Sequence, residues 1–128
     1  DNCFECCSNL IEVFVPSSVI KIGNAAFKDC KSLKNIHLPD SLSSLGINAF
    51  FGCSSLVKIQ IPPSLSVIDV GSFRNCTSLS DVLLTSSITS IKNYSFAGCT
   101  SLKEIYIPIK PENIDKSAFP AETQVTMI

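Results

Sequence analysis

The chain has 128 residues, of which 45% are hydrophobic, and a formal net charge of −1 at pH 7. This length and composition predict one domain, residues 1–128, with enough apolar side chains for a core. The balanced charge argues against binding to nucleic acid or to an anionic membrane, which requires a basic surface. No apolar stretch approaches the roughly 18 residues that span a bilayer, so we expect no membrane insertion by these residues.

The sequence repeats with a period of 23 residues, and several kinds of residue keep the same register. The repeated columns are Leu10, Leu33, Leu56, Leu79 and Leu102; Phe4, Phe27, Phe50, Phe73, Phe96 and Phe119; and Cys7, Cys30, Cys53, Cys76 and Cys99. Independent columns in one register exclude coincidence. They predict a solenoid of stacked coils, with about five repeats and a partial sixth.

Each repeat contains an expected turn and an expected strand. Ala26, Phe27 and Cys30 stand at helical spacing, which predicts a short α-helical or 3₁₀ turn on the convex side of each coil. After each repeated leucine, apolar and polar residues alternate, so that Ile36 is expected to face inward and His37 outward. This alternation predicts one short parallel strand per coil. A proline then ends the strand in four coils, at Pro16, Pro39, Pro62 and Pro108, whereas Thr85 takes this place in the remaining coil.

The two ends of the sequence depart from the repeat. Residue 1 falls in mid-repeat without a polar capping segment before it, so we expect a piece of a longer array whose uncapped ends could support oligomers. Near the other end, Glu122 falls in the cysteine column, and Val125 and Ile128 fall in the leucine and isoleucine columns. A charged residue in a core column predicts a frayed last coil or the start of a cap.

The seven cysteines raise the question of disulfides or metal binding. Stacked coils place equivalent side chains about 4.8 Å apart and parallel, whereas a disulfide requires Cβ atoms about 3.8 Å apart that face each other. We therefore expect the ladder cysteines to be reduced, buried and small. Cys3 and Cys6 have no second pair to complete a metal site. Cys6 alone falls in no repeated column, which makes it the candidate for an exposed, oxidisable thiol or for a partner of a segment upstream.

No catalytic, metal or cofactor site is predicted. The only histidine, His37, is expected on a solvated outward strand position, where it could serve one site at most. Asp81 and Glu104 occupy equivalent positions on successive coils, but lysines nearby suggest a mixed-charge strip. The column Ser18, Ser41, Ser64 and Ser87 is predicted to satisfy backbone groups, and Lys110 breaks it in the fifth coil.

The outward side of the strands is the predicted binding surface. One outward column combines aromatic, apolar and polar residues, namely Phe14, His37, Gln60, Leu83 and Tyr106, flanked by Lys34, Lys58, Lys103 and Glu104. Aromatic side chains are enriched at interface hot spots, which favours protein binding, although scattered exposed apolar residues are also ordinary on a protein surface. A second candidate lies on the convex side, where Ile47, Phe51 and Val70 fall outside the core columns.

The pattern L-x-x-[IV]-x-[IL]-P-x-S-[VL]-x-x-[IL]-G-x-x-A-F-x-x-C-x-x-L, best seen from Leu33 to Leu56, resembles the BspA-like class of leucine-rich repeats. The resemblance implies a surface or secreted adhesin-type module that binds host or matrix proteins without a cofactor. Leucine-rich repeats also bind enzymes such as phosphatases inside cells, so a cytoplasmic scaffold or regulatory subunit is the alternative. A spacer between other domains is a third possibility.

Overall fold

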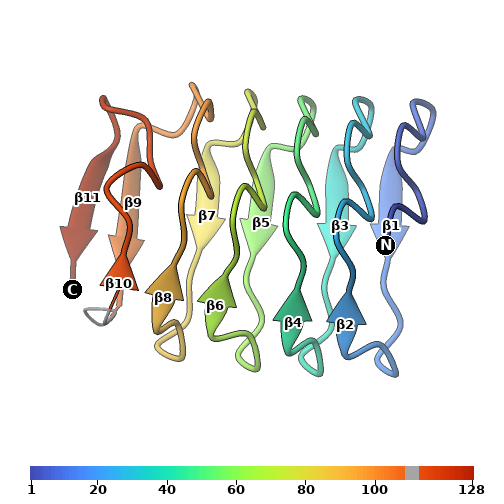
Figure 1. Ribbon diagram of the computed structural model, residues 1–128, viewed down its shortest axis with the longest axis horizontal. Coiled ribbons are helices and arrows are strands. Elements are labelled where there is room, and N and C mark those ends of the chain that lie inside the picture. Colours follow the sequence, from blue (N-terminus) through green and yellow to red (C-terminus); the bar gives the residue numbers. More distant parts are fainter. Residues whose placement is uncertain (109–112) are drawn as a thin grey trace.

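The computed structural model describes residues 1–108 and 113–128, and Lys110 lies outside these described residues. The chain winds into a stack of coils with two rows of short strands (Figure 1). The first row holds β1 (Glu12–Phe14), β3 (Asn35–His37), β5 (Lys58–Gln60), β7 (Asp81–Leu83), β9 (Glu104–Ile107) and β11 (Gln124–Met127). The second holds β2 (Lys21–Ile22), β4 (Ser44–Leu45), β6 (Val67–Ile68), β8 (Ser90–Ile91) and β10 (Asn113–Ile114).

We number the coils by their strands, from coil 1 (β1 and β2) to coil 5 (β9 and β10), and call the outward side of the first row the strand face. The prediction of one strand per coil was wrong, because a second strand forms before each turn, ending at Ile22, Leu45, Ile68, Ile91 and Ile114. Its ladder continues through backbone bonds such as that from the Gly46 N–H to the Ile22 carbonyl, at 2.8 Å.

The predicted helical turns are absent from the described residues, where each turn is a series of bends instead. Alternate amides point in different directions. The Lys28 and Cys30 N–H groups donate to the carbonyls three residues back, whereas those of Phe27 and Asp29 donate to the next coil. A helix needs consecutive amides to bond within its own segment, so the stacking of the coils prevents it.

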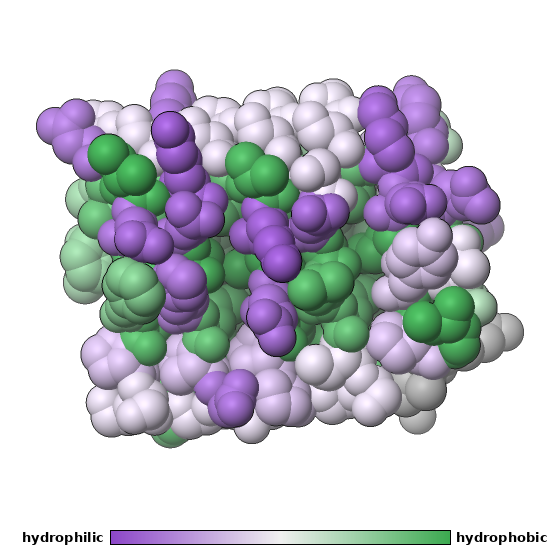
Figure 2. Space-filling view, turned by 180° about the vertical axis from the view of Figure 1, so that it is seen from behind, coloured by the Kyte–Doolittle hydropathy of each residue, from purple (hydrophilic) through white to green (hydrophobic). Residues whose placement is uncertain are grey.

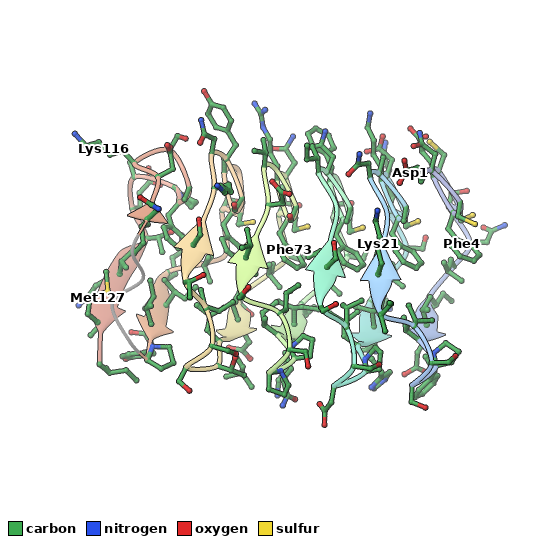
Figure 3. All side chains as sticks on the ribbon, turned by 60° about the horizontal axis from the view of Figure 1, so that its bottom comes forward. Asp1, Phe4, Lys21, Phe73, Lys116 and Met127 are labelled. Atoms are coloured by element: carbon green, nitrogen blue, oxygen red, sulfur yellow. The ribbon has the colours of Figure 1, made fainter. Side chains whose placement is uncertain are left out.

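The core consists of the predicted columns. The six column phenylalanines form one stack, with successive ring centroids 5.2–5.3 Å apart and ring planes within 8° of parallel. Figure 3 shows Phe73 inside the stack of coils and Phe4 at its N-terminal end. The ladder cysteines from Cys30 to Cys99 are buried, and each thiol donates to a phenylalanine carbonyl of the preceding coil at 3.0–3.1 Å.

The strand ladders are discontinuous, although solenoids commonly present adjacent strands as one continuous surface. In the first row, parallel pairing joins β1 to β3, β5 to β7 and β9 to β11. In the second row it joins β2 to β4, and β6 to β8 to β10. Among the described strands, the boundary between coils 2 and 3 therefore lacks pairing in both rows.

The turn that leads into β11 is three residues shorter than the 23-residue repeat predicts. Phe119 still stacks on Phe96, 23 residues earlier, but Val125 pairs with Ile105, only 20 residues earlier. The assignment of Val125 and Ile128 to the leucine and isoleucine columns was therefore wrong. The segment after Phe119 omits the cysteine part of the turn, and the Thr123 hydroxyl instead donates to the Leu102 carbonyl at 2.6 Å.

Candidate functional surface

The strand face exposes every predicted outward residue, including the whole column from Phe14 to Tyr106 and the flanking Lys34, Lys58, Lys103 and Glu104. Hydrophobic and hydrophilic side chains alternate over it, as Figure 2 shows. The face is thus a mixed surface in which apolar groups stand singly among charges.

The N-terminal part of the strand face carries an ordered cluster of Glu12, Phe14 and His37. The Phe14 ring is 69% exposed and stacks on the His37 imidazole, with centroids 4.2 Å apart and planes 2° from parallel. The His37 Nε2 lies 3.1 Å from a Glu12 carboxylate oxygen. Stacking on one side and a polar contact at the ring edge together fix the imidazole in place.

The C-terminal part exposes two large side chains. Leu83 is 48% exposed and Tyr106 is 49% exposed. The Tyr106 hydroxyl donates to a Glu104 carboxylate oxygen at 3.2 Å. Because Tyr106 keeps an apolar ring and a polar tip on the surface, it has the properties of an interface anchor.

A polar groove of about 410 Å³ lies between these two parts, along β3 and β5. His37, Lys58 and Gln60 line it from the strands, and Asp40 and Thr85 line it from the segments that follow β3 and β7. Thr85 is the residue that replaces a proline in the repeat pattern. The groove follows the boundary where neither row of strands is paired.

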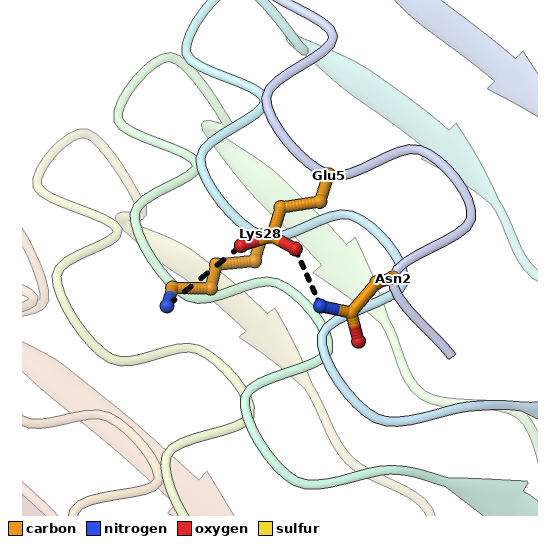
Figure 4. Close-up of polar contacts among 3 residues, drawn as sticks. All are labelled: Asn2, Glu5 and Lys28. Carbon is orange, nitrogen blue, oxygen red and sulfur yellow. Dashed lines mark hydrogen bonds and ion pairs between the residues drawn. The ribbon is translucent and has the colours of Figure 1, made fainter.

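The convex candidates differ in exposure. Ile47 is exposed, whereas Phe51 and Val70 are half-buried. The Phe51 ring lies between two cations, with the Lys28 Nζ 5.5 Å and the Arg74 guanidinium carbon 6.0 Å from its centroid. Lys28 also pairs with Glu5 at 3.9 Å, and Glu5 accepts a bond from Asn2 (Figure 4). The Phe51 ring therefore already makes contacts with side chains of the protein itself.

A family model for the BspA-type leucine-rich repeat region matches residues 1–126 in six copies. The chain belongs to the BspA-type leucine-rich repeat family. Repeats of this family typically serve as protein-interaction modules on solenoids that are not catalytic, and the proteins that carry them are generally surface or secreted proteins of bacteria. No curated protein sequence matches the chain at a significant level.

The solved structures that are similar to this BspA-type chain include two leucine-rich repeat proteins. A leucine-rich repeat protein from Bacteroides ovatus is 32% identical over 97% of the chain, with a TM-score of 0.85. A leucine-rich repeat protein from T. pallidum is 40% identical over 85% of the chain, with a TM-score of 0.81. The chain spans 32% of the first structure and 52% of the second.

All seven cysteines of the BspA-type chain are free thiols. Cys6 does have a place in the repeat, contrary to the sequence interpretation: its φ of +61° matches the left-handed conformation of Asp29, Gly52, Asn75 and Gly98 at equivalent positions. Asp, Gly and Asn tolerate this conformation best, and recognising that shared property would have revealed the column.

Two of the four column serines, Ser41 and Ser87, bond to backbone carbonyls of the preceding coil, as predicted. The Ser41 hydroxyl lies 2.7 Å from the Ser17 carbonyl, and the Ser87 hydroxyl lies 2.6 Å from the Pro63 carbonyl. Within the described ranges, no three His, Cys, Asp or Glu side chains gather as a metal site. None of the described segments is a helix long and apolar enough to cross a membrane.

Proposed function

We propose that this chain is a non-catalytic protein-binding module of a cell-surface or secreted adhesin-type protein, and that it binds host or matrix proteins through the strand face. The observation that supports this most is the exposure of Phe14, Leu83 and Tyr106 on one face of the solenoid. Rigid aromatic anchors surrounded by polar groups are the usual composition of protein interfaces.

The surroundings of His37 support a non-catalytic role. Its imidazole contacts a carboxylate and a phenyl ring, neither of which is a nucleophile that a histidine base could activate. No cofactor is part of the proposal, because reversible protein association needs none.

The test compares two triple variants of the full chain for binding to a panel of extracellular matrix proteins by surface plasmon resonance. Phe14→Ala, Leu83→Ala and Tyr106→Ala together should weaken binding by on the order of 10,000-fold, since hot-spot truncations cost about 2 kcal/mol each and about 1.4 kcal/mol corresponds to tenfold. The matched control is Ile20→Ala, Ile47→Ala and Tyr94→Ala, which removes exposed apolar side chains elsewhere. The control should bind as the unmodified chain does.

Equal affinity of the two triple variants would contradict the strand-face assignment. Failure of the unmodified chain to bind any matrix protein would contradict the adhesin-type role. Circular dichroism of both variants would establish that folding is retained.

A second candidate function is supported by the free thiols. Seven unpaired cysteines suit a reducing compartment, which favours an intracellular scaffold or regulatory subunit that binds an enzyme such as a phosphatase. Export distinguishes the two functions: the full-length protein would be found at the cell surface or in the medium in the first case, and in the cytoplasm in the second.

A further inference from the structure

The boundary between coils 2 and 3 is weaker on its strand side than the boundaries beside it. At the neighbouring boundaries, the Val15 N–H donates to the His37 carbonyl at 3.1 Å and the Ile61 N–H to the Leu83 carbonyl at 2.9 Å. Among the described residues, no equivalent bond joins Leu38 to Gln60. The same holds in the second row, where β4 and β6 are unpaired.

The turn side of this boundary remains closely packed. The Phe50 N–H donates to the Ser72 carbonyl and the Gly52 N–H to the Arg74 carbonyl, both at 2.8 Å. The Phe50 and Phe73 rings are stacked at 5.3 Å, and the Cys76 thiol reaches the Phe50 carbonyl. The backbone hydrogen bonds that join coils 2 and 3 therefore lie along one edge only, whereas side-chain packing continues through the shared core.

A mismatch of spacing explains why the strands part. Equivalent rings of successive coils are 5.3 Å apart on the turn side, whereas paired strands lie about 4.8 Å apart. A stack that keeps both spacings must bend progressively. Interrupting the pairing at intervals releases this bend, and the boundary between coils 2 and 3 is interrupted in both rows.

We propose that this boundary is a hinge, with its axis along the stacked turns from Phe50 to Phe73. Coils 1 and 2 form one rigid block and coils 3 to 5 form the other, which β6, β8 and β10 tie together. Opening widens the groove lined by His37, Lys58 and Gln60, and it changes the angle between the Phe14 cluster and the Leu83–Tyr106 region. The hinge does not depend on what the strand face binds.

The hinge is tested with pairs of spin labels in one outward column of the full chain. Labels at Glu12→Cys and Lys58→Cys span the hinge, and labels at Lys58→Cys and Glu104→Cys span the same number of coils without crossing it. Accessible native thiols are removed by Cys3→Ala, Cys6→Asn and Cys7→Ser, and the buried ones do not label. Electron paramagnetic resonance then compares the two distance distributions.

We expect a broader distribution with a longer mean for the pair that spans the hinge. Distributions of equal width and mean would overturn the proposal. Hydrogen exchange of the unmodified chain provides a second measurement, independent of the labels: the Lys58 and Gln60 amides should exchange at least tenfold faster than those of Asp81 and Leu83. If protection of the amides from exchange is highest in the middle coils and falls steadily toward both ends of the chain, the pattern would indicate fraying of the ends. That result would also overturn the hinge.

Discussion

Individual residues in the turns are selected by backbone conformation as much as by burial. Gly52 has a φ of +75°, and a Cβ placed on it would lie 2.2 Å from a carboxylate oxygen of Asp29 in the preceding coil. Gly98 stands in the same relation to Asn75. Glycine is favoured at these positions because it adopts the left-handed conformation without strain and leaves room for the side chain of its neighbour.

Replacement of this glycine should destabilise the fold. Gly52→Ala should lower the free energy of unfolding by about 1–2 kcal/mol or more, because left-handed backbone is costly for residues with a Cβ and the methyl group meets Asp29. Urea unfolding monitored by circular dichroism measures the change. Adding Asp29→Gly should recover part of the loss, and no loss in the single variant would contradict the steric argument.

Sequence patterns predicted the residues of the core but not the path of the backbone at Cys6. Side chains that share a column through size or hydrophobicity, such as Phe27 and Phe50, are visible as repeats. Cys6, Asp29 and Gly52 share only a backbone angle, and residues so different in side chain show no similarity along a sequence.

At the scale of elements, the strands were predictable and the turns were not. Alternation around Ile36 and His37 correctly predicted the inward and outward faces of β3. Helical spacing of Ala26, Phe27 and Cys30 correctly predicted which side chains are buried, yet the backbone is not helical. The spacing of these residues is enough to bury one face of the turn. The backbone conformation of the turn is determined by the hydrogen bonds between coils.

The phenylalanines of the stack should contribute unequally to the free energy of unfolding, depending on their position in the stack. Phe73 is fully buried between two neighbours, so Phe73→Ala should cost about 3–5 kcal/mol. Phe4 is 45% exposed and has one described neighbour, so Phe4→Ala should cost about 1–2 kcal/mol. Chemical denaturation of the two variants tests this order, and equal losses would argue against the stack as a major source of stability.

At the scale of the molecule, the 23-residue period predicted the solenoid and its exposed face. It did not predict the strand pairing, the hinge or the 20-residue offset of β11. These features arise from the spacing between neighbouring coils and from a three-residue deletion that leaves Phe119 in register. Neither is visible in the composition of one repeat. The roles of Phe14, Leu83 and Tyr106 in binding stay a prediction.

The buried thiols should give the whole molecule a common response to alkaline pH. Burial raises the pKa of Cys53 from 9.0 to about 12 and raises those of Cys30 and Cys76. Between pH 9 and about 12 the Cys53 thiol loses its proton in the unfolded chain and keeps it in the folded one. The free energy of unfolding should therefore fall across this range, by about 1.4 kcal/mol per pH unit for Cys53, and the raised pKa values of Cys30 and Cys76 act in the same direction.

The control for this response is Cys53→Ala, which removes one thiol and leaves the other ionisable groups in place. Its stability should fall less steeply with pH than that of the unmodified chain, as measured by urea unfolding at a series of pH values. Identical slopes would show that the buried thiols do not account for the alkaline loss.

In the first row of strands, pairing repeats every two coils, or twice 23, which is 46 residues, whereas the second row also joins β8 to β10. Asp29 faces Gly52 within the first pair of the first row and Asn75 faces Gly98 within the second, so this left-handed column alternates with the same phase as the first row. Internal duplication or excision of one coil would bring unlike first-row boundaries together. Gain or loss of two coils at a time would preserve the first-row alternation, so the array should lengthen or shorten along this row most easily by two coils.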